Sequence, residues 1–510
     1  MAIVQTLPPA ADGHRRLGLA SPATGEPVGE ITVSTPAEVD AAIARARAAQ
    51  PAWAALPAAE RAAVIARALD VLLARKDEIC ATVQGETGKP LAEALAIEIV
   101  PSCDFINYWA GRAAKDLADE RVGLHGYLKP LKKLYIHYQP LGVVGVITPW
   151  NGPFVLSLNP AVQALLAGNA VVLKPSEVTP YSGGWAAKVL WEAGVPEDVL
   201  QLVHGDGEPG AALVNGDIDK ISFTGSVGTG KKVAAACAER LVPCSLELGG
   251  KDAMIVCADA DLERAANGAV YLSMFNSGQV CIGVERIYVV DSVADEFIKR
   301  VREKAAAVTY GQGNDVGPLF WDRQLEIVTR HVEDARAKGA TILVGGEADT
   351  GKGLFYQPTV VTGLTHDMDL MREETFGPVA AIMRVADEDE AVRLANDSRY
   401  GLSGSVFTKD PKKAIRIARQ LKTGSVVHND AAVIYGVAEA PFGGRKDSGL
   451  GQVNGRNAIR GYTHALPILI DRWGREKENI WYPYADKTVK TLDSAIKNLF
   501  GNHLLRRFMR

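Results

Sequence analysis

The sequence predicts an α/β protein built around a doubly wound parallel sheet. Two observations carry this prediction. Short, fully apolar runs alternate with amphipathic helical patterns through the first half of the chain, and the same alternation repeats with different content in the second half. A chain of 510 residues is also too long for one hydrophobic core, so two or three domains are expected.

The first half contains three helical patterns, in which apolar residues recur at spacings of three and four. They lie at 37–49, 60–84 and 182–192. Runs rich in β-branched, aromatic or purely apolar residues predict strands at 133–138, 143–147, 171–173, 199–203 and 220–223. Strands and helices in this order predict a doubly wound sheet.

The stretch 140–173 carries no charged side chain, which is a property of membrane-spanning segments. Proline and asparagine interrupt it repeatedly, whereas a spanning helix needs roughly 20 mainly apolar residues. A buried strand, loop, helix and strand is therefore expected here.

The second half predicts another α/β domain. Its expected strands are 253–257 and 286–290, and its expected helices are 262–273, 294–307 and 325–338. No short-period repeat is evident, which argues against a solenoid.

The C-terminal end differs in character. Residues 471–486 are charged and aromatic, and a basic amphipathic helix follows. Its apolar face is expected to hold Leu492, Ile496, Leu499, Phe500, Leu504 and Phe508. Such a helix fits either an anionic membrane surface or docking on the protein or its oligomer partner.

Bulk composition narrows the class of function. The net charge of −4 gives no argument for binding nucleic acid. The six cysteines show no metal-like spacing, so no metal site is expected. Few cysteines in a long chain fit free thiols in a reducing cytoplasm, and the N-terminus shows no signal-peptide core.

Cys281 is the candidate nucleophile. It follows Ser277 and Gly278, small residues that let the chain turn tightly and approach a ligand closely. Glu247 lies 34 positions earlier, at the end of an apolar run and directly before Gly249 and Gly250. A carboxylate in that place is suited to deprotonate water.

Residues that follow other expected strands supply further candidates. Asn151, after Pro149 and Trp150, could donate to a developing oxyanion. A glycine-rich turn from Gly225 and Ser226 to Gly230 leads into a helix expected near residue 229, which suits phosphate.

Lys174, Ser176 and Glu177 follow the strand 171–173. Lys174 and Glu177 could bind ribose hydroxyls. The acidic Glu177 disfavours a 2′-phosphate by repulsion, so NAD is expected over NADP, with NADP still possible.

Taken together, these motifs resemble the NAD(P)-dependent aldehyde dehydrogenase superfamily over about 21–463. The matching segments are 86–90, 148–151, 174–177, 223–230, 247–251, 276–281, 373–378 and 441–444. The resemblance implies Cys281 as nucleophile, Glu247 as general base, and Asn151 with the Cys281 backbone N–H as oxyanion site. It implies that Glu374 and Phe376 position the nicotinamide. The full cofactor set expected is Pro149, Trp150, Lys174, Ser176, Glu177, Gly225, Ser226, Gly230, Leu248, Glu374 and Phe376.

The resemblance also implies a division into domains and an assembly. A Rossmann-type cofactor domain is expected at 1–120 and 139–248, and a catalytic domain at 249–448. A β oligomerisation arm is expected at 121–138 and 449–485, followed by the amphipathic tail at 486–510. A homodimer or homotetramer is implied.

The implied reaction is oxidation of an aldehyde to a carboxylate through a thioester on Cys281. Two alternatives stay open, namely an acylating dehydrogenase that passes the acyl group to coenzyme A and a non-catalytic binding protein with the same fold. The substrate also stays open: the run 281–288 is similar to bacterial succinate-semialdehyde dehydrogenases, while long-chain or aromatic aldehydes compete.

Overall fold

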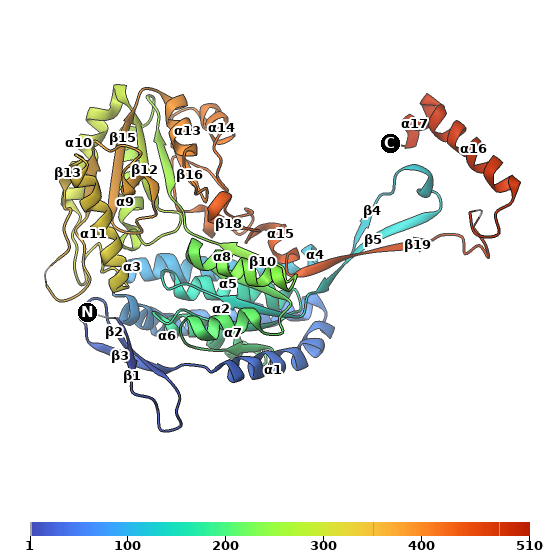
Figure 1. Ribbon diagram of the computed structural model, residues 1–510, viewed down its shortest axis with the longest axis horizontal. Helices are drawn as coiled ribbons and strands as arrows, with labels where there is room; N and C mark the ends of the chain where they lie inside the picture. The colour runs from blue at the N-terminus through green and yellow to red at the C-terminus, as the bar shows by residue number, and fades with distance from the viewer. Residues whose placement is uncertain (1–2, 350, 479, 510) are drawn as a thin grey trace.

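The computed structural model describes residues 3–349, 351–478 and 480–509. Figure 1 shows a body of two lobes, each built on a β-sheet, from which a thin arm projects to one side and ends in two short helices. The first lobe is built mainly from the N-terminal half of the chain, and the second lobe holds the residues from β11 to β17.

The first lobe contains a six-stranded sheet in the order β18-β10-β9-β6-β7-β8. Its strands are β6 (Val143–Ile147), β7 (Ala170–Lys174), β8 (Leu200–Leu202), β9 (Lys220–Thr224), β10 (Cys244–Glu247) and β18 (Gly449–Leu450). All neighbours pair in parallel except β18 with β10. The chain leaves β6 for β7 on one side and returns to β9 on the other. The strand order therefore reverses between β6 and β9, which is where such sheets bind ligands.

Helices cover both apolar faces of this sheet. They are α1 (Pro36–Ala55), α2 (Ala58–Thr87), α4 (Val100–Asp116), α5 (Pro153–Leu166), α6 (Pro180–Glu192), α7 (Gly207–Asn215), α8 (Val227–Glu239) and α15 (Gly455–Arg460). Strands β6 and β7 and the whole of α5 are buried. The uncharged stretch 140–173 is therefore a strand, loop, helix and strand of the core, as predicted. None of the described helices is both long and apolar enough to cross a membrane.

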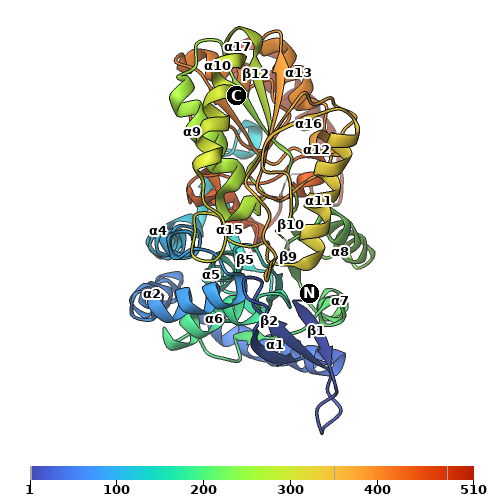
Figure 2. The ribbon, with the colours of Figure 1, turned by 90° about the vertical axis from the view of Figure 1, so that its left-hand side faces the viewer.

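The second lobe contains a seven-stranded sheet in the order β13-β14-β15-β12-β11-β16-β17. The strands are β11 (Asp252–Val256), β12 (Val284–Val290), β13 (Thr341–Val344), β14 (Thr359–Thr362), β15 (Val379–Val385), β16 (Gly404–Phe407) and β17 (Val427–His428). Figure 2 shows α9 (Leu262–Met274) and α10 (Asp291–Ala307) on one side of it, with α11 (Asp322–Ala337) and α13 (Glu388–Asn396) on the other. A separate apolar cluster fills each side. The remaining longer helix is α14 (Pro411–Ala418).

Two three-stranded antiparallel sheets complete the fold. One, at the N-terminus, consists of β1 (Val4–Leu7), β2 (Arg16–Ala20) and β3 (Pro27–Thr32). The other forms the arm, in the order β19-β5-β4, from β4 (Glu120–Val122), β5 (Lys132–Pro140) and β19 (Thr463–Asp471). The pairing of the 133–138 strand with a segment after Gly449 is confirmed. The segment at 449–460 itself packs on the first lobe through β18 and α15, so the chain enters the arm only at β19.

The C-terminal tail differs from the single helix expected. It forms α16 (Asp486–Gly501) and α17 (His503–Met509), because the backbone at Asn502 is extended (φ −86°, ψ 115°). Leu504 therefore does not continue the face formed by Leu492 and Ile496. The side chain of Phe508 lies outside the described residues.

Candidate active site

Two cavities meet at Cys281. One, of about 340 Å³, is a cleft between the lobes. Its walls come from the loops after β6, β9 and β10 and from residues 321–327, 374 and 376 of the second lobe. The other, of about 570 Å³, is lined mainly by apolar side chains. Asn151 and Leu156 also line both cavities. A ligand in the cleft and a ligand in the apolar cavity can therefore approach the same sulfur atom.

The loop that carries Cys281 is held rigidly. Asn276 and Ser277 both adopt left-handed backbone conformations, with φ of 55° and 57°. The Asn276 backbone N–H donates to Glu93 Oε1 at 2.8 Å, and the Ser277 hydroxyl donates to the Gly317 carbonyl at 2.9 Å. These buried bonds compensate the strain of the backbone and fix where the thiol points.

Gly278 is required by space as well as by conformation. Its φ is +74°, and a Cβ atom there would lie 2.0 Å from the carbonyl oxygen of Gly377. The glycine predicted from the turn therefore lets the loop that carries Cys281 approach the segment that contains Phe376.

The electrostatic surroundings of Cys281 disfavour a thiolate. Burial raises the pKa of the thiol well above its usual range, and the carboxyl groups of Glu374, Asp252 and Glu247 raise it further. A thiol in this state needs a proton acceptor or a bound positive charge before it can act as a nucleophile.

Glu247 ends β10 inside the same cleft. Its side chain is buried, and neither carboxyl oxygen has a hydrogen-bond partner. Burial therefore raises the pKa of the carboxyl well above 4.5. A buried carboxyl group without hydrogen-bond partners lowers the stability of the folded protein. Its position beside Cys281 and its raised proton affinity are the properties of a general base.

Asn151 is anchored by a buried ion pair that the sequence did not reveal as part of the site. Its side-chain Nδ2 donates to the Gln279 carbonyl at 3.0 Å, which ties it to the nucleophile loop. Its backbone carbonyl accepts from Lys89 Nζ at 3.0 Å, and Lys89 forms a fully buried ion pair with Glu98, also at 3.0 Å.

The loop that carries Glu374 and Phe376 is fixed by a second buried ion pair. Glu285 accepts the backbone N–H groups of Thr375 and Phe376 at 2.8 and 2.9 Å, and it pairs with Lys251 at 2.6 Å. Glu374 Oε1 accepts the Gly250 N–H at 2.9 Å, and burial raises the pKa of Glu374 to about 8.

Aromatic rings line the cleft beside this loop. The Phe376 ring packs edge-to-face on Trp150, with centroids 5.5 Å apart. Phe376 is itself held at a φ of 52°.

Lys174, Ser176 and Glu177 lie at the end of β7, next to β6 in the sheet. Lys174 is buried, and its Nζ donates to the Pro175 carbonyl at 3.2 Å and lies 4.0 Å from Glu177 Oε2. Burial lowers the pKa of Lys174. These three residues do not line the cleft itself; they flank it at the neighbouring strand.

The glycine-rich turn follows β9. Ser226 caps α8 by accepting the Thr229 N–H at 3.3 Å, so the helix starts at Val227. Gly225 and Ser226 line the cleft. Gly230 lies one turn further on, where a Cβ atom would approach the Leu248 side chain to 2.4 Å. Because Thr229 also lines the cleft, the N-terminus of α8 lies at the cleft wall.

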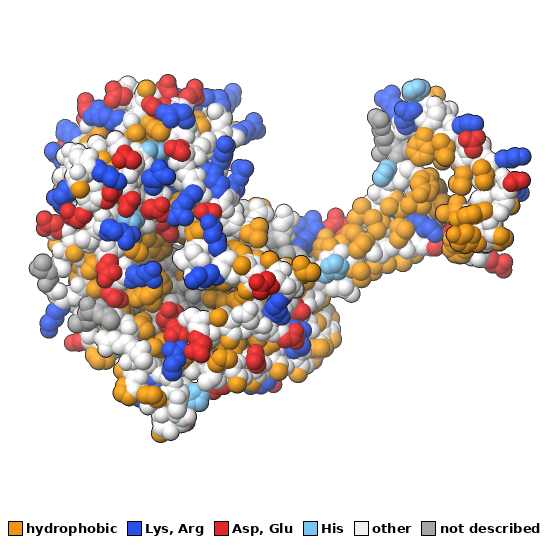
Figure 3. Space-filling model, viewed as in Figure 1, with side chains coloured by type: hydrophobic (Ala, Val, Ile, Leu, Met, Phe, Trp, Pro, Cys, Tyr) orange, Lys and Arg blue, Asp and Glu red, His pale blue; other side chains and the backbone are white. Residues whose placement is uncertain are grey.

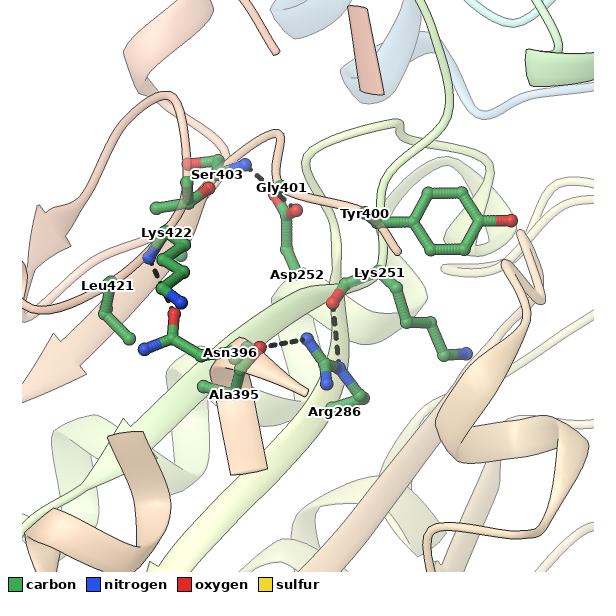
Figure 4. A pocket seen from close by; sticks show the side chains of 13 residues that line it. Lys251, Asp252, Arg286, Ala395, Asn396, Tyr400, Gly401, Ser403, Leu421 and Lys422 are labelled. Carbon is green, nitrogen blue, oxygen red and sulfur yellow. Dashed lines mark hydrogen bonds between the residues drawn. The ribbon is translucent and has the colours of Figure 1, made fainter. Parts of the chain in front are cut away.

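A much smaller pocket lies behind the Glu247–Lys251 segment (Figure 4). Asp252 accepts the Ser403 N–H at 3.0 Å, and Arg286 donates to the Lys251 carbonyl at 2.9 Å. Its volume of about 20 Å³ suffices for one water molecule and no substrate. The two hydrogen bonds in its wall hold the start of the strand β11 in place.

The tertiary structure thus brings ten of the fourteen predicted site residues into one cleft. These are Pro149, Trp150, Asn151, Gly225, Ser226, Glu247, Leu248, Cys281, Glu374 and Phe376. The supporting pairs Lys89–Glu98 and Lys251–Glu285, together with Glu93, were not predicted. Each is a charged residue whose partner is fixed only by folding.

Comparison with known proteins agrees with this geometry. The pattern of the aldehyde dehydrogenase family matches residues 10–466. The chain is 43% identical over 455 residues to a Mycolicibacterium smegmatis protein named "Putative succinate-semialdehyde dehydrogenase", which is specified for NADP(+); the match covers 88% of this chain and 87% of that protein. It is 38% identical over 487 residues to 4,4'-diapolycopene aldehyde oxidase of Methylomonas sp, covering 95% of this chain and 91% of that protein.

Solved structures give the same result. The crystal structure of Mycobacterium tuberculosis aldehyde dehydrogenase complexed with NAD+ superposes with a TM-score of 0.86 at 38% identity, covering 91% of this chain and 96% of that one. An NAD-dependent aldehyde dehydrogenase of Sinorhizobium meliloti gives a TM-score of 0.88 at 35% identity, covering 94% and 96%. A match of this extent, on a chain whose cysteine, glutamate and asparagine converge in one cleft, shows that the protein belongs to the aldehyde dehydrogenase family.

Proposed function

We propose that this chain oxidises an aldehyde to a carboxylate with NAD(P)+, with Cys281 as the nucleophile and Glu247 as the general base. One observation carries the proposal. Cys281 lies where the cleft and the apolar cavity meet, and a buried carboxyl without partners lines the same cleft.

In the first half of the reaction, the Cys281 sulfur bonds to the aldehyde carbon and the thiol proton passes to Glu247 or to water. The carbonyl oxygen becomes an oxyanion, and when the carbon-bound hydrogen departs as a hydride to the acceptor that the dinucleotide would supply, the C=O bond re-forms and a thioester is left on Cys281. The Asn151 amide carries two hydrogens, and only one is needed for the bond to the Gln279 carbonyl. The second, with the Cys281 backbone N–H, would stabilise the oxyanion. Where one such donor was removed from another enzyme, the loss was about 2.7–4 kcal/mol.

In the second half, a thioester on Cys281 is hydrolysed. Glu247 takes a proton from water, the hydroxide bonds to the acyl carbon, and the carbon–sulfur bond breaks. The carboxylate leaves, and the thiol is regenerated. The raised pKa of Glu247 suits this role, because a stronger base accepts the proton of water more readily.

The residues of the cleft fit a bound nicotinamide dinucleotide. The N-terminus of α8 and the small residues Gly225 and Ser226 suit a pyrophosphate, and Glu374 and Phe376 would hold the nicotinamide end. When bound, this group supplies the hydride acceptor. Lys174 and Glu177 would hold the adenosine ribose, and the charge of Glu177 favours NAD over NADP. Because the name of the Mycolicibacterium relative specifies NADP(+), the assay below includes NADP+ as well as NAD+.

Hydrolysis is preferred over transfer of the acyl group to coenzyme A because Glu247 lies in the cleft as a base for water. The non-catalytic alternative would be marked by loss of the thiol, base or oxyanion donor, and this chain keeps all three.

The test is aldehyde oxidation by the purified protein with NAD+ or NADP+, with and without coenzyme A. Cys281→Ser should abolish oxidation while cofactor binding, followed by fluorescence, survives. Substantial activity in that variant would refute the nucleophile. Acyl-coenzyme A as the main product would refute the role of Glu247.

We also propose that the chain is a cytoplasmic homodimer or homotetramer, with 1–120 and 139–248 as cofactor domain and 249–448 as catalytic domain. The arm strand β19 pairs only with β5 among the described strands, and Ile468, Leu469 and Ile470 on it are exposed. An exposed apolar edge of this kind favours pairing with another chain. The six free cysteines fit a reducing compartment. Sedimentation at equilibrium would test the assembly, and a monomeric mass would refute it.

We propose, as a second role, that the tail contacts an anionic membrane surface. On α16, the apolar side chains Val489, Leu492, Ile496 and Phe500 are exposed, so the helix does not dock on its own body. Figure 3 shows orange hydrophobic side chains on the surface of the tail. Residues 472–510 contain nine Lys and Arg and four Asp and Glu, so this segment has a net charge of 9 − 4 = +5, whereas the net charge of the whole chain is −4. Exposed Trp473, Trp481 and Tyr484 suit the membrane interface.

Sedimentation with liposomes of neutral and anionic composition tests this role. The full chain should sediment with anionic liposomes, and both a chain ending at Asp471 and Leu492→Asp/Ile496→Asp should stay in solution. Equal partitioning of these proteins would refute membrane contact. A smaller assembly in the shortened chain, without any liposome binding by the full chain, would assign the tail to another copy instead.

A further inference from the structure

The apolar cavity that ends at Cys281 has almost no charged side chains in its lining. Its lining comes from the π-helical turn Leu95–Ile99, the start of α4, α5, the end of α9 and the segment 431–437. Among the described residues that line it, Asp104 is the only charged side chain, and it is acidic and exposed. No lysine or arginine of the described chain lines this cavity.

We propose that the substrate is an uncharged aldehyde with an elongated apolar chain, and that this site discriminates against aldehydes that carry a carboxylate. The inference rests on the proposed oxidation at Cys281 and specifies its substrate class. It departs from the succinate-semialdehyde name of the Mycolicibacterium relative, because succinate semialdehyde carries a carboxylate at the third carbon from its aldehyde carbon.

Apolar side chains line the cavity both at its inner end and at its rim. Near Cys281 it is walled by buried side chains such as Val155, Leu272 and Ile282. At the outer end Val100, Val433 and Val437 are 64%, 48% and 40% exposed. An alkyl or polyene chain could therefore extend from the sulfur to the surface while it loses water along its whole length.

A carboxylate in this cavity would find no partner of opposite charge. The amides of Asn151 and Asn276 already donate to the Gln279 carbonyl. They lie at the Cys281 end, where the aldehyde oxygen would compete for them. The Tyr435 hydroxyl, which accepts a hydrogen bond from Asn159 Nδ2 at 3.4 Å, carries no positive charge.

Two basic groups near Cys281 face away from this cavity. Lys89 is buried in its pair with Glu98, and Arg323 lines the other cleft, beyond Cys281. A succinate-semialdehyde carboxylate would be desolvated without compensation, which is strongly unfavourable. A longer ω-carboxylate would reach the rim and meet Asp104, a like charge.

The decisive pair of substrates is butanal and succinate semialdehyde, which have the same chain length and differ in a methyl group against a carboxylate. With the full chain and NAD+, kcat/KM for butanal should exceed that for succinate semialdehyde at least about 100-fold. From butanal to octanal, kcat/KM should rise roughly fourfold for each added methylene, the ratio that corresponds to about 0.8 kcal/mol per buried CH₂.

A gain-of-charge variant provides the matched control. Val437→Arg places a cation at the exposed rim, and Val437→Met adds comparable length without charge. The Arg variant should raise the ratio of kcat/KM for 8-oxooctanoate to kcat/KM for octanal at least about tenfold over the same ratio in the Met variant. Because Val437 is exposed, neither variant should disturb folding.

The outcomes separate this inference from the proposed function. If succinate semialdehyde is oxidised as well as or better than butanal, the substrate class is overturned while the reaction stands. If the Arg and Met variants treat 8-oxooctanoate alike, the rim does not sense charge and this part of the inference fails. If no aldehyde in either series is oxidised, the proposed function itself fails.

Discussion

The ion pair of Lys89 with Glu98 gives the sharpest test of how the site is supported. Both side chains are fully buried, and their charged atoms lie 3.0 Å apart. Glu98 Oε2 also accepts the backbone N–H groups of Phe154 and Val155 at 3.1 and 3.0 Å, at the start of α5. Lys89→Met would leave the Glu98 carboxylate buried without its cation.

Removal of one partner of a buried pair destabilises by about 3–5 kcal/mol, because the other charge is left uncompensated. For a domain of about 150–250 residues, a loss of 1 kcal/mol in the free energy of unfolding lowers the Tm by roughly 2–4 °C. Lys89→Met should therefore lower the Tm by at least about 6 °C. The double variant Lys89→Met/Glu98→Gln should recover more than half of this loss, because the amide oxygen still accepts the two N–H groups of α5 and no buried charge remains.

Catalysis provides a second readout. The Asn151 carbonyl loses the Lys89 hydrogen bond in both variants, so the oxyanion donor is held less firmly. Displacement by about 1 Å lowers rates by roughly 100-fold, so kcat should stay reduced by at least about tenfold even in the double variant.

Scanning fluorimetry and steady-state aldehyde oxidation measure both effects, and Lys232→Met, which removes an exposed lysine from α8, is the control. A Tm within about 2 °C of the parent, or a double variant as unstable as Lys89→Met, would refute the reasoning.

Three further predictions concern the site and its surroundings. Glu247→Gln should give a burst of reduced cofactor followed by slow turnover. Because burial raises the pKa of Glu247, its basic form grows as pH rises, so the hydrolysis-limited rate of the parent should climb with pH, and a flat parent profile would contradict this. Gly278→Ala should lower kcat at least about 100-fold in steady-state assays, because the added Cβ would lie 2.0 Å from the Gly377 carbonyl oxygen; a fully active variant would disprove the close packing. Burial lowers the pKa of His331 from 6.5 to about 4, so the stability it contributes above pH 6.5 is lost as pH falls toward 4. The Tm should therefore drop between pH 7 and pH 5 and drop less in His331→Gln, and equal slopes would exclude His331 as the cause.

Much of the fold could be predicted from local patterns. Strands such as β6 are continuous apolar runs, because a parallel sheet covered by helices on both faces buries every side chain. The helices α1 and α2 follow the predicted periodicity closely. The tail could not be predicted in the same way, because the hydrophobic pattern continues across Asn502 although the helix stops there.

The candidate site divides similarly. Cys281 follows small residues of a turn, and Glu247 and Asn151 stand close to glycines or prolines after apolar runs, which are local signals. Lys89 also lies between Gly88 and Pro90 in a segment that matches the family, but its role could not be predicted, because it depends on a contact with Asn151, 62 positions away.

The sequence by itself determined the alternation of strands and helices, the residue types of the reaction and their order along the chain. These are local properties, since apolar period, turn chemistry and motif spacing are written in neighbouring residues. Only the tertiary structure decided that Cys281 lies between a cleft and an apolar cavity, and that, among the described residues, the Glu247 carboxyl has no hydrogen-bond partner and no Lys or Arg lines the cavity. Burial and charge pairing depend on residues that meet only in the folded chain, and for that reason the class of aldehyde could be proposed only from the structure.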